Sequence, residues 1–375
     1  MAKELISLAP VVERAILVGA PLKRSNARHA VDEHLLELER LVDTAGGVVV
    51  GTLTQQLDRP NPSTYVGSGK LEELKIMATE REATLLISDD ELTPAQGKNL
   101  ELELGKRVVD RAELILDIFA VRARSAEARM QVELAQLEYS LPRLTRMWTH
   151  LEKFHGGIGV RGPGETQLET DRRLVGHRIK ILKGRLQDVK RSREVQRQSR
   201  RGTFRVSLVG YTNAGKSSLL QVLVGGDDIF VEDRLFATLD PLTREVALGD
   251  HEKALVTDTV GFIRKLPHHL VASFRATLEE VHDADVLLHV IDASDPGFER
   301  QLEVTDNVLA EIGAEKVPRL RVFNKIDRVG DAKAQRARAK ALRAAYPKCI
   351  VMSAIDAEDV DKLRKTIRAF FGKRL

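Results

Sequence analysis

The chain of 375 residues has little cysteine and no long apolar run. Cys349 is its only cysteine, which excludes an internal disulfide and a cysteine-based zinc cluster and indicates a reducing compartment. No apolar run approaches the roughly 18 residues that a membrane span requires, and the first residues lack the apolar core of a signal peptide. We therefore expect a cytoplasmic protein with no stable insertion into a membrane.

Net charge is also small. The chain has 59 Lys and Arg against 55 Asp and Glu, a net charge of +4, so any signal for nucleic-acid binding depends on where the charges lie. A hydrophobic share of 43% and a charged share of 30% are typical of a soluble globular protein. The length predicts two or three domains.

Residues 1–110 alternate short apolar segments with helical patterns, which predicts a small parallel α/β domain. The segment Tyr65–Lys70 has a Gly-x-Gly turn before a helix but lacks the spacing of a phosphate-binding loop. For this segment we favour an ordinary turn or an RNA contact over a second nucleotide site. Strands are expected at 15–18, 48–50, 84–88 and 108–109, with helices at 30–42, 71–82 and 94–104.

Residues 111–201 are rich in helix formers and predict an antiparallel helical hairpin. A glycine-rich loop at 154–165 separates its two helices, and Pro142 is expected to kink the first helix or shift its start. Each helix has an apolar seam with spacings of three and four. The seams run through Ala123, the polar Glu127, Met130, Leu134, Leu137, Leu141, Leu144 and Trp148, and through Leu168, Val175, Ile179, Leu182, Leu186 and Val189.

The second helix of this hairpin is strongly basic. Nine Lys or Arg lie between Lys180 and Arg201, against Asp188 and Glu194. A solvated helix face and a helix that follows a phosphate backbone explain this run about equally well.

The loop at 154–165 is a candidate RNA contact. It holds five glycines, more than a turn of a few residues needs, and it also contains Arg161. A flexible tip of this composition suits insertion into a narrow RNA environment. The residues expected to contact RNA are Arg161, Gly162 and Gly164.

Residues 210–218 fit G-x-x-x-x-G-K-[ST], the pattern of a phosphate-binding P-loop, between an expected strand and an expected helix. Glycines in such a loop let the backbone approach phosphate oxygens, and the helix N-terminus adds positive potential. Lys216 is expected to reach the β- and γ-phosphates, and Ser217 to hold Mg²⁺. The expected nucleotide-binding residues are Gly210, Asn213, Ala214, Gly215, Lys216, Ser217 and Ser218.

Further phosphate and metal partners follow the P-loop. Asp258 ends an expected strand and is predicted to reach Mg²⁺ through water, while the Gly261 N–H binds the γ-phosphate. A switch threonine must lie between the P-loop and Asp258, and we prefer Thr238 over Thr243 as the Mg²⁺ ligand. Lys216, Thr238 and Gly261 are therefore the expected catalytic groups.

The motif Asn324–Asp327, N-K-x-D, predicts guanine as the base. The Asp327 carboxylate can accept from N1–H and the 2-amino group, a pair of donors that adenine lacks, while Asn324 holds the loop and the Lys325 stem covers the ring. The backbone amides of Ser353 and Ala354 are expected to donate to guanine O6. GTP is therefore the predicted substrate.

Two residues depart from the simplest small GTPases. Phe262 stands where a water-orienting glutamine often lies, so we expect slow hydrolysis by the protein alone and stimulation by a bound partner. Asn213 could offer its carbonyl oxygen to a monovalent cation such as K⁺ between the phosphates. A role in shaping the loop explains Asn213 equally well.

These motifs resemble the HflX family of translational GTPases over nearly the whole chain. The resemblance rests on GYTNAGKSS at 210–218, LFATLDP at 235–241, DTVGFIRKLP at 258–267, NKID at 324–327 and GGIGVRGPGETQLETDRR at 156–173. It implies binding to rRNA of the large ribosomal subunit, with the hairpin loop near the peptidyl-transferase centre, and splitting or rescue of stalled ribosomes under stress. It also implies that some members use ATP through the N-terminal domain, whereas the C-terminal domain of some members is not expected here.

The expected fold class is α/β with three parts. These are a parallel α/β domain at 1–110, a helical hairpin at 111–201 and a Ras-like P-loop GTPase domain at 202–375. The expected function is a GTPase whose nucleotide state sets its affinity for the ribosome, with hydrolysis resetting it. The alternative is an RNA or ribosome assembly or chaperone module that uses GTP only as a structural switch.

Overall fold

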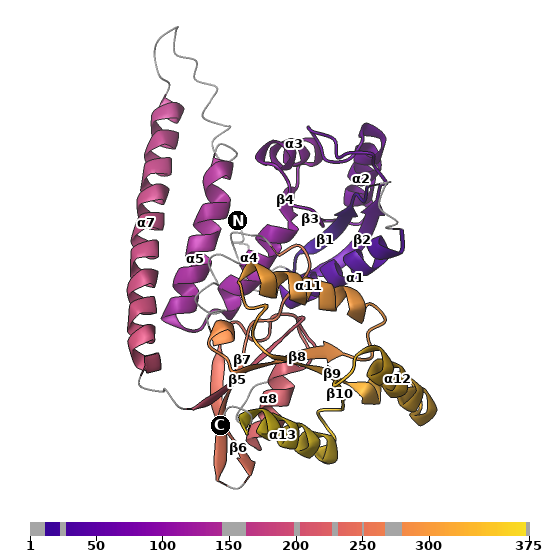
Figure 1. Ribbon diagram of the computed structural model, residues 1–375. Helices are drawn as coiled ribbons and strands as arrows, with labels where there is room; N and C mark the ends of the chain where they lie inside the picture. Colours follow the sequence, from indigo (N-terminus) through magenta and orange to yellow (C-terminus); the bar gives the residue numbers. More distant parts are fainter. Residues whose placement is uncertain are drawn as a thin grey trace, which may run out of the picture. The chain divides into compact units, whose positions relative to one another are not determined.

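The computed structural model describes residues 12–22, 28–144, 163–198, 203–226, 232–249, 251–266 and 280–372. Its contacts divide the chain into two compact units. The first unit comprises Met1–Ile118 and Tyr139–Gly176, and the second comprises Phe119–Glu138 and His177–Leu375. A four-stranded sheet lies in the first unit and a six-stranded sheet in the second (Figure 1).

The four-stranded sheet confirms the predicted parallel α/β fold. Its strands lie in the order β2-β1-β3-β4 and every neighbouring pair is parallel. Helices fill the connections because a parallel pair needs a long crossover. The strands are β1 (Arg14–Gly19), β2 (Val48–Thr54), β3 (Leu85–Ser88) and β4 (Arg107–Asp110), and the helices are α1 (Arg28–Thr44), α2 (Ser68–Glu80), α3 (Pro94–Leu104) and α4 (Arg111–Arg122).

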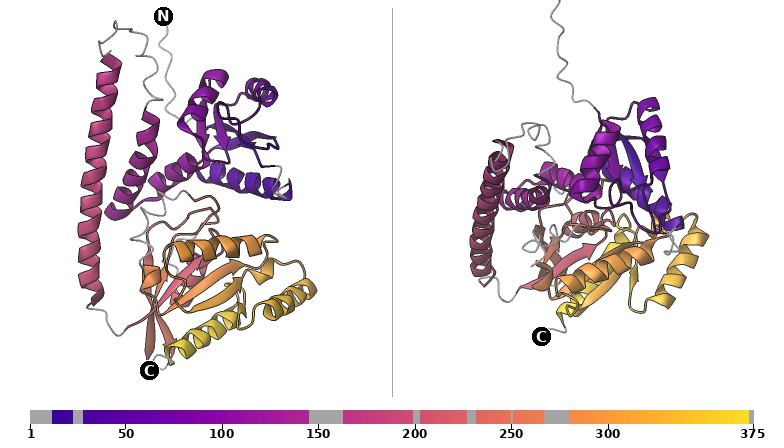
Figure 2. Two further views of the ribbon diagram at one scale, coloured as in Figure 1. Left: turned by 45° about the horizontal axis from the view of Figure 1, so that its top comes forward. Right: turned by 90° about the horizontal axis from the view of Figure 1, so that it is seen from above.

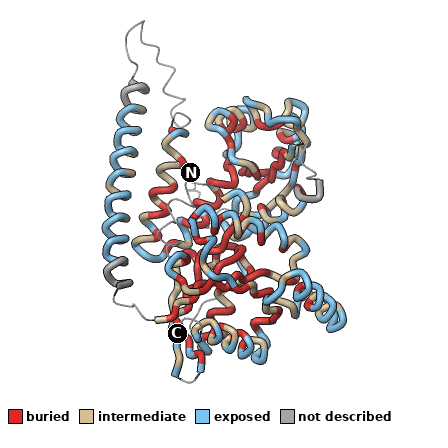
Figure 3. The backbone as a smooth tube through the Cα atoms, viewed as in Figure 1, coloured by how far each residue is buried: buried red, intermediate tan, exposed pale blue. Residues whose placement is uncertain are grey.

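The six-stranded sheet has the order β10-β9-β8-β5-β7-β6, and only β6 is antiparallel to its neighbour. Its central strands are buried along almost their whole length, as expected for strands covered on both faces (Figure 3). The strands are β5 (Phe204–Gly210), β6 (Leu242–Gly249), β7 (Glu252–Asp258), β8 (Val286–Asp292), β9 (Arg319–Asn324) and β10 (Ile350–Val351). The helices are α8 (Lys216–Val224), α11 (Phe298–Glu311), α12 (Ala332–Ala345) and α13 (Ala357–Phe371).

Two long helices form the middle of the chain, α5 (Ala126–Ser140) and α7 (Pro163–Gln198). Within the second unit, residues 126–138 of α5 lie beside the C-terminal half of α7, and the chain directions are opposite (Figures 1 and 2). The ion pairs Arg178–Glu133 and Lys183–Glu138 join them. The predicted seam of α7 is confirmed, because its residues are buried or half-buried at Leu168, Val175, Ile179, Leu182, Leu186 and Val189.

Three predictions for the hairpin need correction. Ala123 does not belong to the first seam, because it lies in the break between α4 and α5 at residues 123–125, whereas Met130, Leu134 and Leu137 lie in α5 and are buried or half-buried. Pro142 neither kinks α5 nor shifts its start, because α5 ends at Ser140 and a 3₁₀ turn, Leu141–Arg143, follows.

The predicted end of the tip loop at 154–165 was also wrong. The helix α7 begins at Pro163, because proline suits the first turn of a helix, so Gly164 is helical. Residues 154–162 lie outside the described residues, and with them Arg161 and Gly162.

Candidate nucleotide site

The P-loop crosses from the end of β5 to the start of α8 in a conformation that only glycine tolerates at two positions. Gly210 has φ +145°, and a Cβ there would lie 2.2 Å from the Val290 carbonyl oxygen. Gly215 has φ +94°, and its Cβ would lie 2.3 Å from Asn324 Nδ2. The loop therefore passes closely over both neighbouring strand ends, β8 and β9, and keeps its amide groups at the carboxyl edge of the sheet.

Lys216 lies buried at the first position of α8. Its Nζ donates to the carbonyl oxygens of Gly210, at 3.2 Å, and Tyr211, at 2.9 Å. Burial lowers the pKa of this ammonium group to about 8, although the nearby Asp258 carboxylate acts in the opposite direction. The cation is thus held along the loop by weak neutral acceptors, in a position where a phosphate would be a stronger partner.

Three oxygen-bearing side chains meet beside Lys216. Ser217 Oγ donates to Asp258 Oδ2 at 2.6 Å, and it lies 2.8 Å from Thr238 Oγ1. Among the described residues no donor reaches the buried Asp258 Oδ1, and burial raises the pKa of this carboxyl group. Mg²⁺ is a hard cation that prefers such oxygen ligands, so this donor set fits it.

The structure distinguishes the two switch threonines. Thr238 reaches Ser217, whereas Thr243 lies in β6 with its Oγ1 2.9 Å from Thr257 Oγ1 on β7. The preference for Thr238 over Thr243 as the metal ligand therefore agrees with the geometry.

Gly261 and Phe262 lie flat against the P-loop. The Phe262 N–H donates to the Gly210 carbonyl at 3.1 Å, and the Thr212 N–H donates to the Phe262 carbonyl at 2.7 Å. A Cβ on Gly261 would lie 2.6 Å from Thr212 Cα. The Phe262 side chain is only 1% exposed, so it is part of the core and cannot orient a water molecule in the pocket.

Asn324 and Lys325 connect the P-loop to the guanine-binding end of the site. Asn324 Nδ2 donates to the Ala214 carbonyl at 3.1 Å, while its Oδ1 accepts from the Ala354 N–H at 3.0 Å. Lys325 Nζ donates to the backbone carbonyl of Asn213 at 2.6 Å and pairs with Asp292 at 2.9 Å. The predicted phosphate and base motifs are therefore joined by direct contacts.

The turn Ser353–Ala354 differs from its predicted geometry. We expected both amides to face guanine O6, but the Ser353 N–H donates to Asp359 Oδ2 at 3.1 Å and the Ala354 N–H donates to Asn324. The Ser353 hydroxyl also donates to Asp327. The turn satisfies its own polar groups here, so recognition of O6 through either amide requires exchange of an internal hydrogen bond.

Sequence reasoning missed several residues that shape the site. Asp292 pairs with Lys325 and caps the turn after β8, Thr212 Oγ1 accepts from the Phe236 N–H at 2.9 Å, and Glu232 and Arg234 line the phosphate pocket. The position of Asp292 at the carboxyl end of a parallel strand is the signal that could have identified it. No feature of the sequence indicates the contacts of Thr212 or Glu232.

His289 and Cys349 are packing residues. His289 is buried in β8, and burial lowers its pKa to about 3, so its ring stays neutral. Cys349 is half-buried and packs against the core.

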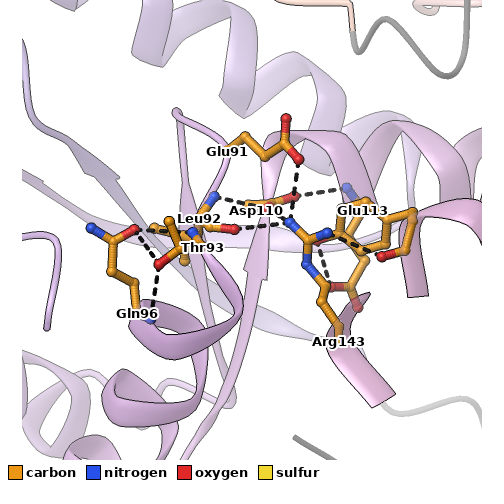
Figure 4. Close-up of polar contacts among 8 residues, drawn as sticks. Glu91, Leu92, Thr93, Gln96, Asp110, Glu113 and Arg143 are labelled. Carbon is orange, nitrogen blue, oxygen red and sulfur yellow. Dashed lines mark hydrogen bonds and ion pairs between the residues drawn. The ribbon is translucent and has the colours of Figure 1, made fainter. Parts of the chain in front are cut away.

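The N-terminal unit has a different polar cluster at the carboxyl end of β4 (Figure 4). The buried Asp110 accepts from the N–H groups of Leu92 and Glu113, each at 3.0 Å, and from the Arg143 guanidinium at 3.4 Å. Arg143 also donates to the Leu92 carbonyl at 2.8 Å and lies 3.7 Å from the centre of the Tyr139 ring. Each group shown is satisfied by another residue of the same unit.

The turn at Tyr65–Lys70 is likewise satisfied from within. The Gly67 N–H donates to Gln55 Oε1 at 2.8 Å, and Lys70 pairs with Glu73 at 2.7 Å. These contacts favour the ordinary turn over a second nucleotide site.

The described part of the chain contains neither a cluster of metal-binding side chains nor a candidate membrane-spanning helix. No group of three or more His, Cys, Asp or Glu in it could hold a metal ion. In the same residues no helix is long and apolar enough to cross a membrane.

Comparison with known families gives three consecutive matches. Residues 32–120 match the model of the GTP-binding GTPase N-terminal region, and residues 122–200 match the GTP-binding GTPase middle region. Residues 205–325 match the model of the 50S ribosome-binding GTPase. Together with a P-loop, a magnesium-type oxygen cluster and N-K-x-D at one sheet edge, these matches define a P-loop GTPase.

Individual relatives identify the family. The chain is 51% identical to a GTPase HflX from Caldanaerobacter subterraneus over 322 residues, which cover 85% of this chain and 74% of that protein. It is 49% identical to GTPase HflX from Escherichia coli over 301 residues, covering 80% and 70%. The crystal structure of SsGBP with GDP matches with TM-score 0.52 and 28% identity, covering 97% and 100%. The chain belongs to the HflX family of GTPases and hydrolyses GTP.

Proposed function

We propose that this GTPase binds the large ribosomal subunit in its GTP state and splits or rescues stalled ribosomes under stress, with hydrolysis resetting it. The match of its GTPase domain to the 50S ribosome-binding family supports a ribosomal partner. Family membership does not specify what the GTPase does on the ribosome, and splitting or rescue of stalled ribosomes is the proposed step.

The observation that carries the proposal is the charge on α7. Lys180, Lys183, Arg185, Lys190 and Arg191 are all exposed, and α7 leads away from the glycine-rich segment. Lys183 pairs with Glu138 and Arg191 pairs with Asp188, but no acidic partner of Lys180 or Arg185 is found among the described residues. A rigid helix with unneutralised cations suits the phosphate backbone of rRNA.

Within the site, each motif has a separate role in hydrolysis. Lys216 binds the β- and γ-phosphates and neutralises charge that develops between them, and the Gly261 N–H donates to the γ-phosphate. Ser217 and Thr238 would hold Mg²⁺, with Asp258 acting through water, and the ion would supply charge neutralisation on the phosphates. Asp327 selects guanine.

Phe262 makes the partner part of the mechanism. Because its side chain is buried and its backbone is bonded to the P-loop, the water that attacks the γ-phosphate must be oriented by another group. A group supplied or ordered by the ribosome fits this requirement. We therefore expect turnover to be slow for the protein alone and to rise on adding large ribosomal subunits.

Turnover with and without large subunits tests the proposal. The double variant Lys180→Glu and Arg185→Glu should lose most of the stimulation while its basal turnover is unchanged. The matched control is Lys333→Glu with Arg336→Glu on α12, which makes the same charge change on exposed residues of the GTPase domain. If large subunits do not stimulate turnover but RNA remodelling persists, the alternative function, an assembly or chaperone module with GTP as a structural switch, is favoured.

We further propose that Asn213 binds K⁺ between the phosphates. Its Nδ2 donates to Asp233 Oδ1 at 2.9 Å, so the amide is held in one orientation and its carbonyl oxygen stays available as a ligand. Replacing sodium by potassium should raise turnover, and Asn213→Ala should abolish the difference. Equal rates of the native protein in the two salts would contradict this assignment.

ATP binding by the N-terminal domain stays a prediction. The internal contacts of Gly67 and Lys70 argue against the turn at Tyr65–Lys70 as its site. Titration of the protein with labelled ATP, with the GTPase site blocked by GDP, is the measurement that decides it.

A further inference from the structure

The switch I segment, residues 232–240, is attached to the junction of α4 and α5 at three points. Glu232 forms an ion pair with Arg122. Phe236 packs edge-on against Phe119, with ring centres 4.7 Å apart. Asp240 contacts the two residues that precede α5. All these residues belong to the same compact unit, so the contacts lie within it.

Asp240 caps the N-terminus of α5 from a distant part of the chain. Its Oδ2 accepts from the N–H groups of Arg124, at 3.0 Å, and Ser125, at 3.1 Å, and its Oδ1 accepts from the Ser125 hydroxyl. Ser125 Oγ in turn accepts from the Ala128 N–H at 3.0 Å. A helix leaves its first N–H groups without partners inside the helix, and its N-terminus attracts negative charge, so this carboxylate stabilises α5 in both ways.

Thr238 lies between two fixed points of the same segment. On one side, Phe236 is 1% exposed, has φ +55° and donates its N–H to Thr212 Oγ1 in the P-loop. On the other side, Asp240 is bonded to the start of α5. With only one residue between Thr238 and each of these points, movement of Thr238 away from Ser217 must strain or break one attachment.

We propose that Asp240 is a positioning residue that couples the nucleotide to α5. When the triphosphate and its metal hold Thr238, Asp240 stays on the helix N-terminus and α5 is capped. When Thr238 is released, Asp240 leaves, and Arg124 and Ser125 at the start of α5 lose the carboxylate that holds them. Because coupling is reciprocal, an intact cap also favours the triphosphate over the diphosphate.

The inference goes beyond the proposed function and does not depend on it. It concerns the nucleotide site and α5 only, so it holds whether or not the ribosome is the partner. If Asp240 acts in this way, the helical middle region, which contains α5 and α7, is coupled to the state of the nucleotide.

Amide hydrogen exchange of residues 124–131 in the full chain tests the coupling. The native protein should exchange these amides more slowly with a non-hydrolysable GTP analogue than with GDP. In Asp240→Ala the two states should exchange equally, and the preference for the GTP analogue over GDP should fall about fivefold. Asp240→Asn retains one oxygen acceptor and should restore part of the difference. The matched control is Asp306→Ala on α11, which removes a partly exposed aspartate whose partner is Arg319.

The outcomes separate coupling from a purely structural cap. A structural cap would make Asp240→Ala exchange faster by the same factor in both states and would leave the nucleotide preference unchanged, which would overturn the proposal. No difference between the two states in the native protein would also overturn it. If Asp240→Ala does not fold, Ser125→Ala removes only the hydroxyl contacts and should reduce the same difference. Loss of ribosome binding in any variant has no bearing on this result.

Discussion

The two sheets of this protein carry polar residues at the carboxyl ends of their parallel strands but use them differently. At the six-stranded sheet, Asp258 Oδ1 meets no donor among the described residues, and Lys216 is held only by two carbonyl oxygens. At the four-stranded sheet, Asp110 accepts two backbone N–H groups and Arg143. The first edge keeps polar capacity for a ligand, whereas Asp110 at the second edge is used in holding loops of its own unit together.

This difference predicts which property each substitution changes. Residues of the open edge should alter binding and hydrolysis with little effect on folding. Residues of the closed edge should alter folding with little effect on nucleotide. A substitution that changes both nucleotide binding and folding would contradict this difference between the two edges.

The largest effect is expected for Asp258→Asn. GTP hydrolysis should fall by roughly 100-fold or more, because the variant loses the charge that favours the metal and aligns the phosphates. Thermal unfolding of the nucleotide-free protein should stay the same or shift upward, since a buried carboxylate with a raised pKa is replaced by a neutral amide. A strongly lowered Tm would show that Asp258 mainly stabilises the fold, which would contradict its place at the open edge.

Asp110→Ala should have the opposite signature. It leaves two backbone donors and Arg143 without their acceptor, so the free energy of unfolding of the N-terminal unit should fall by about 3 kcal/mol. GTP affinity should not change. Glu103→Ala, which removes an exposed partner of Lys75, is the control and should change stability by less than about 1 kcal/mol. A large loss of GTP affinity in Asp110→Ala would break the contrast between the edges.

Asp327→Asn tests base recognition at the open edge. The amide retains one acceptor but places a donor against the guanine donors, so GTP affinity should fall about 30-fold, the effect of about 2 kcal/mol for a hydrogen bond to a charged group. Affinity for xanthosine triphosphate, whose 2-position is an acceptor, should rise. Unchanged GTP affinity would contradict the assignment of Asp327.

The smallest predicted effect is a pH dependence of GTP affinity. Lys216 has a pKa of about 8 in the nucleotide-free protein, below its ordinary value of 10.5. Bound phosphates require the protonated form, so affinity should be constant with respect to this group below pH 8. Above pH 8 it should fall by up to about tenfold per pH unit, because binding must then take up a proton.

The control for the pH series is Lys216→Arg, whose guanidinium stays protonated throughout. This variant binds more weakly at every pH because its side chain has a different shape, but its affinity should not decline above pH 8. A parallel decline in both proteins would assign the effect to another group.

Much of the open edge could be predicted from the sequence because its chemistry is local. Gly210–Ser218 and Asn324–Asp327 are short motifs at strand ends, and parallel topology brings strand ends together. The contact of Thr238 with Ser217 was expected because a switch threonine must lie between the P-loop and Asp258. The strand positions followed from apolar runs, and the parallel order followed from their alternation with helices.

Other contacts could not be predicted because they join distant residues without a motif. Asp240 and Ser125 are separated by 115 positions, and nothing in either segment indicates the other. The internal use of the Ser353 and Ala354 amides depends on how Asn324 and Asp359 pack. The break between α4 and α5 falls at residues 123–125, where the sequence has neither Gly nor Pro to indicate it.

The central claim is that the nucleotide state sets the affinity for the large ribosomal subunit. Co-sedimentation with isolated large and small subunits, in the presence of a non-hydrolysable GTP analogue, GDP or no nucleotide, tests it most directly. The protein should sediment with the large subunit in the GTP-analogue state, and much less with GDP or without nucleotide. Equal sedimentation in all three states, or sedimentation with the small subunit alone, would contradict it.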